Sequence, residues 1–211
     1  MSIQTDIFHH DGYLRINSRR LEHLATLGLP LNNRRVLEVG AGIGDHSSFY
    51  IDRKCKITIT EGRVDNVEYI KNVYPQEDIR ILDMDNPVLP DGEKWETIHC
   101  YGLLYHLNFP GKAIAFLAKR CESFMVLETI AHDNDIDVTR AEEPKDIQQN
   151  SLSGLCYRFS KTWVLKQLQA NFKYVYTTKT HPYHRDFPRI RGIFIASHVE
   201  IINNNLLTYK E

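Results

Sequence analysis

Apolar runs alternate with amphipathic stretches along most of the chain, which is the pattern of helices packed on a mostly parallel sheet. The apolar runs predict seven strands, at residues 35–39, 56–60, 79–82, 97–101, 124–130, 173–180 and 191–199. The first five are short and rich in apolar or β-branched residues, as strands buried on both faces should be. The last two are longer and are joined by a short connection, which suits an antiparallel pair and not a helical crossover.

Five stretches with apolar residues at helical spacing predict helices, at residues 18–27, 45–52, 63–73, 113–121 and 160–170. Pro110 lies just before the fourth, where proline is tolerated at a helix start, and Ser160 can cap the fifth. We therefore expect an α/β fold with a seven-stranded, mostly parallel sheet, the last strand antiparallel, and helices on both faces.

The length of 211 residues suits one domain. Within it we expect a helical N-terminal extension over residues 1–33 and the core over residues 34–200. Residues 131–157 have no clear period and many polar side chains, and connections of this length are usually functional. We expect them to form a lid or substrate loop.

Composition narrows the class of protein. The chain holds 26 basic and 27 acidic residues, which gives no whole-protein reason to expect nucleic acid. Residues 151–211 hold 9 basic and 3 acidic groups, and this local excess could favour an anionic substrate or form a solvated surface. No apolar run approaches the ~20 residues that cross a bilayer. With no signal peptide and no C-x-x-C, we expect a cytoplasmic protein with reduced thiols and no membrane partner.

The clearest motif joins the first predicted strand to the helix after it. Gly40, Gly42 and Gly44 form a G-x-G-x-G turn, where the absence of Cβ atoms lets a ligand approach the backbone. Dinucleotide sites favour G-x-G-x-x-G, with room for a pyrophosphate. Here the third glycine comes one residue earlier, and the carboxylate of Glu38 would repel a pyrophosphate but could hold an ammonium group. A sharp turn without a ligand is the alternative.

The run Glu38-Val-Gly-Ala-Gly-Ile-Gly resembles the first motif of the class I S-adenosylmethionine-dependent methyltransferases, which have a Rossmann-like sheet. The order of elements also matches that family over roughly residues 17–200. The resemblance implies S-adenosyl-L-methionine as the cofactor. It implies that Gly40, Ala41, Gly42 and Gly44 cradle the methionine part, and that Glu38 reaches the amino group.

Acidic residues follow the next two strands, as the same resemblance requires. Glu61 would accept both ribose hydroxyls, since a carboxylate offers two acceptor oxygens. Asp83 would accept from the adenine amino group, with Met84 against the ring and Asp85 as a possible substitute for Asp83. Surface acids without a ligand are the alternative.

The fourth strand runs into Tyr101-Gly-Leu-Leu-Tyr-His-Leu, which resembles the fourth motif of a bacterial and phage subgroup that reads G-x-L-Y-H-L. The Asp/Asn-Pro-Pro-aromatic motif is absent, which counts against N-methylation of DNA bases. A hydroxyl acceptor needs a base, and histidine titrates near neutral pH. We expect His106 to be that base, with Tyr101 beside the cofactor and Tyr105 beside the acceptor; core packing is the alternative for all three.

A second cluster follows the sixth strand. His181, His184 and Arg185 could line the acceptor side of the crevice, and Arg158 could bind an acceptor carboxylate or phosphate. Solvated loop residues are the alternative. We expect no metal, because His181-x-x-His184 lacks a third ligand and Asp133-x-Asp135-x-Asp137 departs from the sequence of a calcium loop.

The predicted function is methyl transfer to a small-molecule or glycan-type acceptor, at oxygen. Carboxymethyl or methyl transfer to tRNA is a second hypothesis. Carboxymethyl transfer needs an additional basic contact to the carboxylate of the modified cofactor, which Arg158 or Arg185 would have to supply. A cofactor-binding protein without turnover and a nicotinamide-binding protein are two more.

Overall fold

The computed structural model describes residues 6–133 and 138–209. Part of the predicted lid, residues 134–137, lies outside the described residues, as do Asp135 and Asp137 of the aspartate run. Within the described ranges, no helix has both the length and the apolar character needed to span a membrane.

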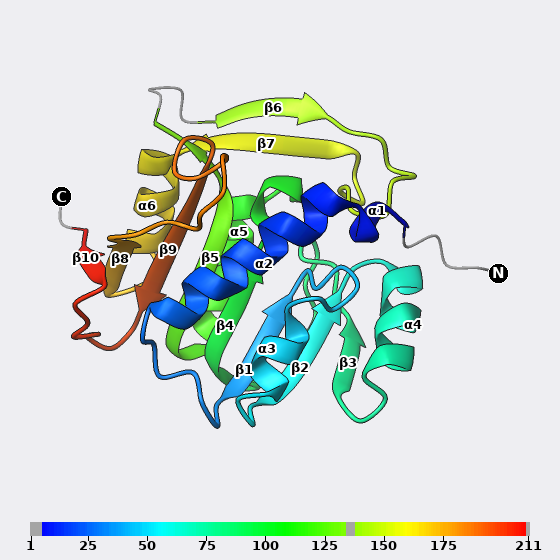
Figure 1. The fold of residues 1–211 in the computed structure, drawn as a ribbon, viewed down its shortest axis with the longest axis horizontal. Helices are drawn as coiled ribbons and strands as arrows, with labels where there is room; N and C mark the ends of the chain where they lie inside the picture. The colour runs from blue at the N-terminus through cyan, green and yellow to red at the C-terminus, as the bar shows by residue number, and fades with distance from the viewer. Residues whose placement is uncertain (1–5, 134–137, 210–211) are drawn as a thin grey trace.

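One mixed sheet forms the centre of the molecule, with the strand order β10-β8-β9-β5-β4-β1-β2-β3 (Figure 1). Its strands are β1 (Arg35–Val39), β2 (Lys56–Glu61), β3 (Asp78–Ile81), β4 (Trp95–Tyr101), β5 (Cys121–His132), β8 (Tyr174–Thr178), β9 (Arg191–Ser197) and β10 (Leu206–Thr208). The pairs from β3 to β5 are parallel, whereas β9 is antiparallel to both β5 and β8. The predicted fold class is confirmed, including the antiparallel strand.

Helices cover both faces of this sheet. They are α1 (Asp6–His9), α2 (Asp11–Thr26), α3 (Ser47–Ile51), α4 (Val64–Val73), α5 (Pro110–Arg120) and α6 (Lys161–Gln169). One apolar cluster joins the sheet to α2, α3 and α4 through Leu24, Phe49 and Ile70. The other joins it to α5 and α6, on the opposite face. Pro110 begins α5, and the Ser160 hydroxyl caps α6 by accepting from the Trp163 N–H at 3.0 Å, as the sequence predicts.

A hairpin of β6 (Val138–Glu142) and β7 (Leu155–Ser160) occupies most of the segment for which the sequence predicts a loop. The sequence of β6 shows no alternation of apolar and polar residues, because four of its five residues are exposed. The end of β5 pairs in parallel with β7, so the hairpin lies beyond the carboxyl ends of the strands (Figure 1). The short strand β10 was also not predicted.

Candidate functional site

A cavity of about 860 Å³ lies at the carboxyl ends of β1, β2 and β4, where parallel sheets of this kind bind ligands. It collects most of the predicted site residues: Glu38, Gly40, Ala41, Gly42, Glu61, Asp83, Met84, Tyr101, Tyr105, His106, His184 and Arg185. The structure does not bring Gly44, Arg158 or His181 to the cavity wall. Gly44 lies beneath the ring of Tyr74, and Arg158 and His181 are exposed elsewhere.

The glycine turn forms one wall of this cavity, and its backbone requires glycine. Gly40 and Gly42 have φ angles of +67° and +61°, which side chains of L-residues rarely adopt. A Cβ on Gly40 would collide with Leu103, and one on Gly42 would lie 3.1 Å from the ring of Phe8 in α1. Leu103 and Phe8 also line the cavity, so the missing side chains let these apolar groups pack against the turn.

The carboxylate of Glu61, at the end of β2, is fixed against this turn. It accepts from the Gly42 N–H at 2.9 Å and, with its other oxygen, from the Arg63 N–H at 2.9 Å. Burial raises the pKa of Glu61, although these hydrogen bonds oppose the shift. Each oxygen can accept a further hydrogen bond, so the group can still receive two hydroxyls.

Glu38 is the most deeply buried acid of the cavity wall, with 1% of its surface exposed. Burial raises its pKa to about 7; the hydrogen bond from the Ser47 hydroxyl at 2.6 Å opposes this, and the neighbouring Asp45 and Glu61 add to it. A cation placed against Glu38 would favour the ionised form. This part of the cavity therefore suits a positively charged ligand.

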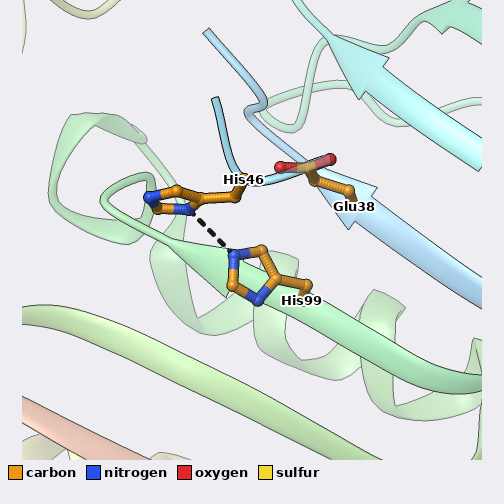
Figure 2. Close-up of side chains that lie close together, drawn as sticks. All are labelled: Glu38, His46 and His99. Atoms are coloured by element: carbon orange, nitrogen blue, oxygen red, sulfur yellow. Dashed lines mark hydrogen bonds between the residues drawn. The ribbon is translucent and has the colours of Figure 1, made fainter. Parts of the chain in front are cut away.

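Two histidines that the sequence did not single out lie beside Glu38 (Figure 2). The His46 Nδ1 and His99 Nε2 atoms are 3.1 Å apart, and His99 Nδ1 lies 2.8 Å from the Tyr50 hydroxyl. Burial lowers the pKa of His46 to about 3 and that of His99 well below its ordinary value, so both rings are neutral. Together with Glu38, the two histidines offer three possible metal-ligand atoms that lie within 4.8 Å of one another. The two imidazole rings, however, already hydrogen-bond to each other, and His99 also hydrogen-bonds to Tyr50.

The two aspartates after β3 have different surroundings. Asp85 accepts from the backbone N–H groups of Asn108 and Phe109 and from the Asn108 side chain, and so fixes the start of α5. Asp83 accepts from the Asp85 N–H at 2.9 Å and lies in the cavity wall next to the buried Met84. Of the two acids, Asp83 keeps more free acceptor capacity toward the cavity.

His106 lies in the short 3₁₀ helix Leu104–His106, directly after β4. Its Nδ1 is 2.5 Å from the carboxylate of Glu143, which also accepts from the Ser151 N–H at 2.6 Å. Burial alone would raise the pKa of Glu143, but these hydrogen bonds outweigh it and hold the pKa below its ordinary value. An ionised carboxylate only accepts, so the proton of neutral His106 is on Nδ1 and Nε2 keeps a lone pair.

Glu143 follows β6 directly, in the segment predicted to be a lid. Arg63 donates from one nitrogen to the carbonyls of Lys145, Asn150 and Ser151 and so ties this segment to the start of α4. Residues 148–152 line the cavity. Glu143 could not be predicted from the sequence, because its place in the site depends on a contact with a residue 37 positions away.

No protein-family model matches the chain. A stretch of 115 residues is 29% identical to the tRNA U34 carboxymethyltransferase of Pseudoalteromonas translucida (strain TAC 125); it covers 50% of this chain and 35% of that protein. The chain thus matches about a third of the length of this curated relative.

Two solved structures share the fold over most of the chain. The N-terminal domain of EvdMO1, in the presence of SAH and D-fucose, has a TM-score of 0.69 and 19% identity, covering 90% of this chain and 84% of its own. The 1,6-didemethyltoxoflavin-N1-methyltransferase of Burkholderia thailandensis, with S-adenosylhomocysteine bound, has a TM-score of 0.64 and 14% identity, covering 92% and 82%. At these identities the likeness establishes the Rossmann-like fold of class I methyltransferases.

Proposed function

We propose that this chain is an S-adenosylmethionine-dependent methyltransferase that acts on an oxygen of a small-molecule or glycan-type acceptor. The observation that carries the proposal is the glycine turn with the Glu61 carboxylate fixed to its backbone, in the wall of a cavity large enough for a nucleoside and an acceptor. The fold shared with SAH-bound methyltransferases supports it.

The residues present fit this cofactor. Glu38 would hold its ammonium group, the turn at 40–42 its methionine part and Glu61 its ribose, with Asp83 and Met84 at the adenine. When bound, S-adenosylmethionine supplies a methyl group on a positively charged sulfur, which is already activated for displacement. The acids at the ends of β1 and β2 match this positive charge.

In the proposed reaction His106 is the base. Its Nε2 would take the proton from the acceptor hydroxyl as that oxygen bonds to the methyl carbon; the methyl–sulfur bond would break, and S-adenosylhomocysteine would leave as a neutral thioether. Glu143 holds the Nδ1–H and stabilises the imidazolium that results. The cavity wall and the segment at 143–152 align the acceptor and limit the access of water.

We expect S-adenosylhomocysteine to raise the melting temperature of the protein and NAD or NADP to leave it unchanged. Incubation with methyl-labelled cofactor and a metabolite extract should then transfer label to an acceptor of low mass. Binding without any transfer would instead favour a cofactor-binding protein without turnover. Stabilisation by the nicotinamide cofactors alone would contradict the assignment of the cavity.

Transfer to tRNA is the second candidate, favoured by the local similarity to the tRNA carboxymethyltransferase. Of the two arginines that the sequence suggested for a donor carboxylate, Arg158 is not in the cavity wall, and the side chain of Arg185 is 91% exposed at its edge. Adding a tRNA fraction to the labelling experiment separates the candidates, because ribonuclease would release label from this product only.

Cofactor binding should depend on pH through Glu38. Its pKa is about 7 in the free protein, and a bound ammonium group favours the ionised carboxylate. Binding therefore releases a proton below pH 7. The affinity for S-adenosylhomocysteine should rise by at most about tenfold per pH unit from about pH 6 to about pH 7, and should then level off. Calorimetry in two buffers of different ionisation enthalpy measures this proton release.

The isosteric variant Glu38→Gln is the control for this dependence. It should bind S-adenosylhomocysteine more weakly at pH 8, with most of the pH dependence gone, because it has no proton to lose. A variant that keeps the pH profile of the parent would show that another group titrates.

A further inference from the structure

Two arginines of the cavity wall form a cluster with one buried glutamate. Arg20 of α2 and Arg191, the first residue of β9, contact the two oxygens of Glu128 in β5 at 2.9 and 3.0 Å. The exposed fraction of the side chain is 6% for Arg20, 14% for Arg191 and 0% for Glu128. Two guanidinium groups share one carboxylate, so the cluster carries a net positive charge.

Apart from Glu128, the groups that accept hydrogen bonds from the two arginines are uncharged. Arg191 also donates to the Tyr105 hydroxyl at 3.3 Å, and Arg20 donates to the side-chain amide oxygen of Asn17 at 3.0 Å. The Asn17 amide in turn donates to the carboxylate of Asp45 at 3.2 Å. Among the ion pairs of residues 6–133 and 138–209, none gives either arginine a second carboxylate. Both arginines line the cavity, so a ligand can supply the missing negative charge.

Three acids of the cavity wall lie on the β1–β3 side of the sheet: Glu38 in β1, Glu61 at the end of β2 and Asp83 after β3. Arg191 begins β9, and Arg20 reaches Glu128 of β5 from α2. Between β1 and β5 lies β4, and each strand adds about 4.8 Å of separation. The acids of β1 and β2 and the acid after β3 suit the cofactor of the proposed function, on which this inference rests, and the two arginines are then available to the acceptor.

We propose that the acceptor carries a carboxylate or phosphate group, which binds to Arg191 and Arg20. An anion there offsets the cost of a buried net charge and forms charge-assisted hydrogen bonds, which guanidinium groups make with two parallel N–H donors. The proposal explains why part of the basic excess of residues 151–211 lies inside the protein, at Arg191, and not on the solvated surface.

The position of the cluster also limits the size of the acceptor. The guanidinium carbon of Arg191 lies 5.1 Å from the centre of the Tyr105 ring, and that ring lies 4.1 Å from the His106 ring. A molecule built on one six-membered ring can therefore contact Arg191 with its anionic group and present a hydroxyl to His106. Hydroxybenzoates and sugar phosphates have this size and charge.

The test uses the full chain saturated with S-adenosylhomocysteine, whose binding is measured first. The probes are 4-hydroxybenzoate and glucose 6-phosphate, with 4-hydroxybenzamide and glucose as their neutral counterparts. We expect at least one charged probe to bind about tenfold or more tightly than its neutral counterpart, with an affinity that falls as salt rises. In ¹⁵N spectra of the unsubstituted protein, this probe should shift Nε–H signals that the Arg191 and Arg20 variants identify.

Arg191→Gln should reduce the affinity for the charged probe to that for the neutral one, while S-adenosylhomocysteine binds as before. Arg189→Gln is the matched control, since this arginine also belongs to the basic C-terminal part of the chain but is exposed and lies outside the cavity wall. It should change the affinity for the charged probe by less than about twofold. If Arg191→Gln does not fold, the comparison of charged and neutral probes on the unsubstituted protein still decides.

Equal binding of charged and neutral probes, or no binding of either charged probe, would overturn the inference. So would an Arg191→Gln variant with the affinity of the parent for the charged probe. Each of these results leaves the proposed function intact if S-adenosylhomocysteine binds. Failure of S-adenosylhomocysteine itself to bind is a different result and would overturn the proposed function.

Discussion

His106→Ala should lower the turnover number by a factor of about 10² to 10⁴ and leave the affinity for S-adenosylhomocysteine nearly unchanged, because positioned general bases contribute rate factors of about that size. The imidazole lies in the cavity wall after β4, with Nδ1 held by Glu143. Single-turnover methyl transfer, with the acceptor found in the labelled extract, measures the rate, and calorimetry measures the affinity.

Glu143→Gln separates positioning from catalysis in this pair. An amide oxygen can still accept from Nδ1–H, but it carries no charge to stabilise the imidazolium. We expect a smaller loss of rate, about tenfold. In a protein that already carries His106→Ala, Glu143→Gln should have little further effect on the rate. A His106→Ala variant with the turnover of the parent would remove the histidine as base.

The sequence located the central sheet because its strands are buried on both faces and read as apolar runs. The positions of β1, β2 and β4 were predicted to within two residues at each end. The hairpin of β6 and β7 was missed for a physical reason, since β6 is exposed and gains its structure by pairing with β7 and not by burying side chains. The helix α2 begins earlier than predicted, at Asp11, because its first turns are polar or exposed on one side.

The residues of the candidate site likewise fall into two groups, those that the sequence predicts and those that it does not. Residues at the ends of strands, such as Glu61 and His106, could be predicted because the strand order alone brings them to one edge of the sheet. Glu143 and the two arginines of the buried cluster reach the cavity from a hairpin, a helix and an antiparallel strand, and only tertiary packing places them there. Gly44 was assigned to the ligand through the motif, but its missing side chain makes room for Tyr74.

Gly42→Arg should weaken the binding of S-adenosylhomocysteine at least 100-fold, which corresponds to about 2.7 kcal/mol. Three effects combine at this position. A Cβ would press on the Phe8 ring at 3.1 Å, the φ of +61° is unfavourable for arginine, and the N–H of residue 42 must keep its bond to Glu61. The new guanidinium would also lie near Glu61 and Glu38 and neutralise the acids that favour a cation. Calorimetry measures the affinity, and circular dichroism checks that the domain still folds.

Gly92→Arg is the control for the backbone part of this effect. Gly92 also has a left-handed φ, +74°, but a Cβ there would meet no atom within 4 Å, and the residue is exposed and outside the cavity. Both variants should lose about 1–2 kcal/mol of folding free energy from the unfavourable φ, whereas only Gly42→Arg should lose the ligand. If both variants bind S-adenosylhomocysteine as the parent does, the turn at 40–42 is not the cofactor site. If both lose it, global destabilisation and not the turn explains the loss.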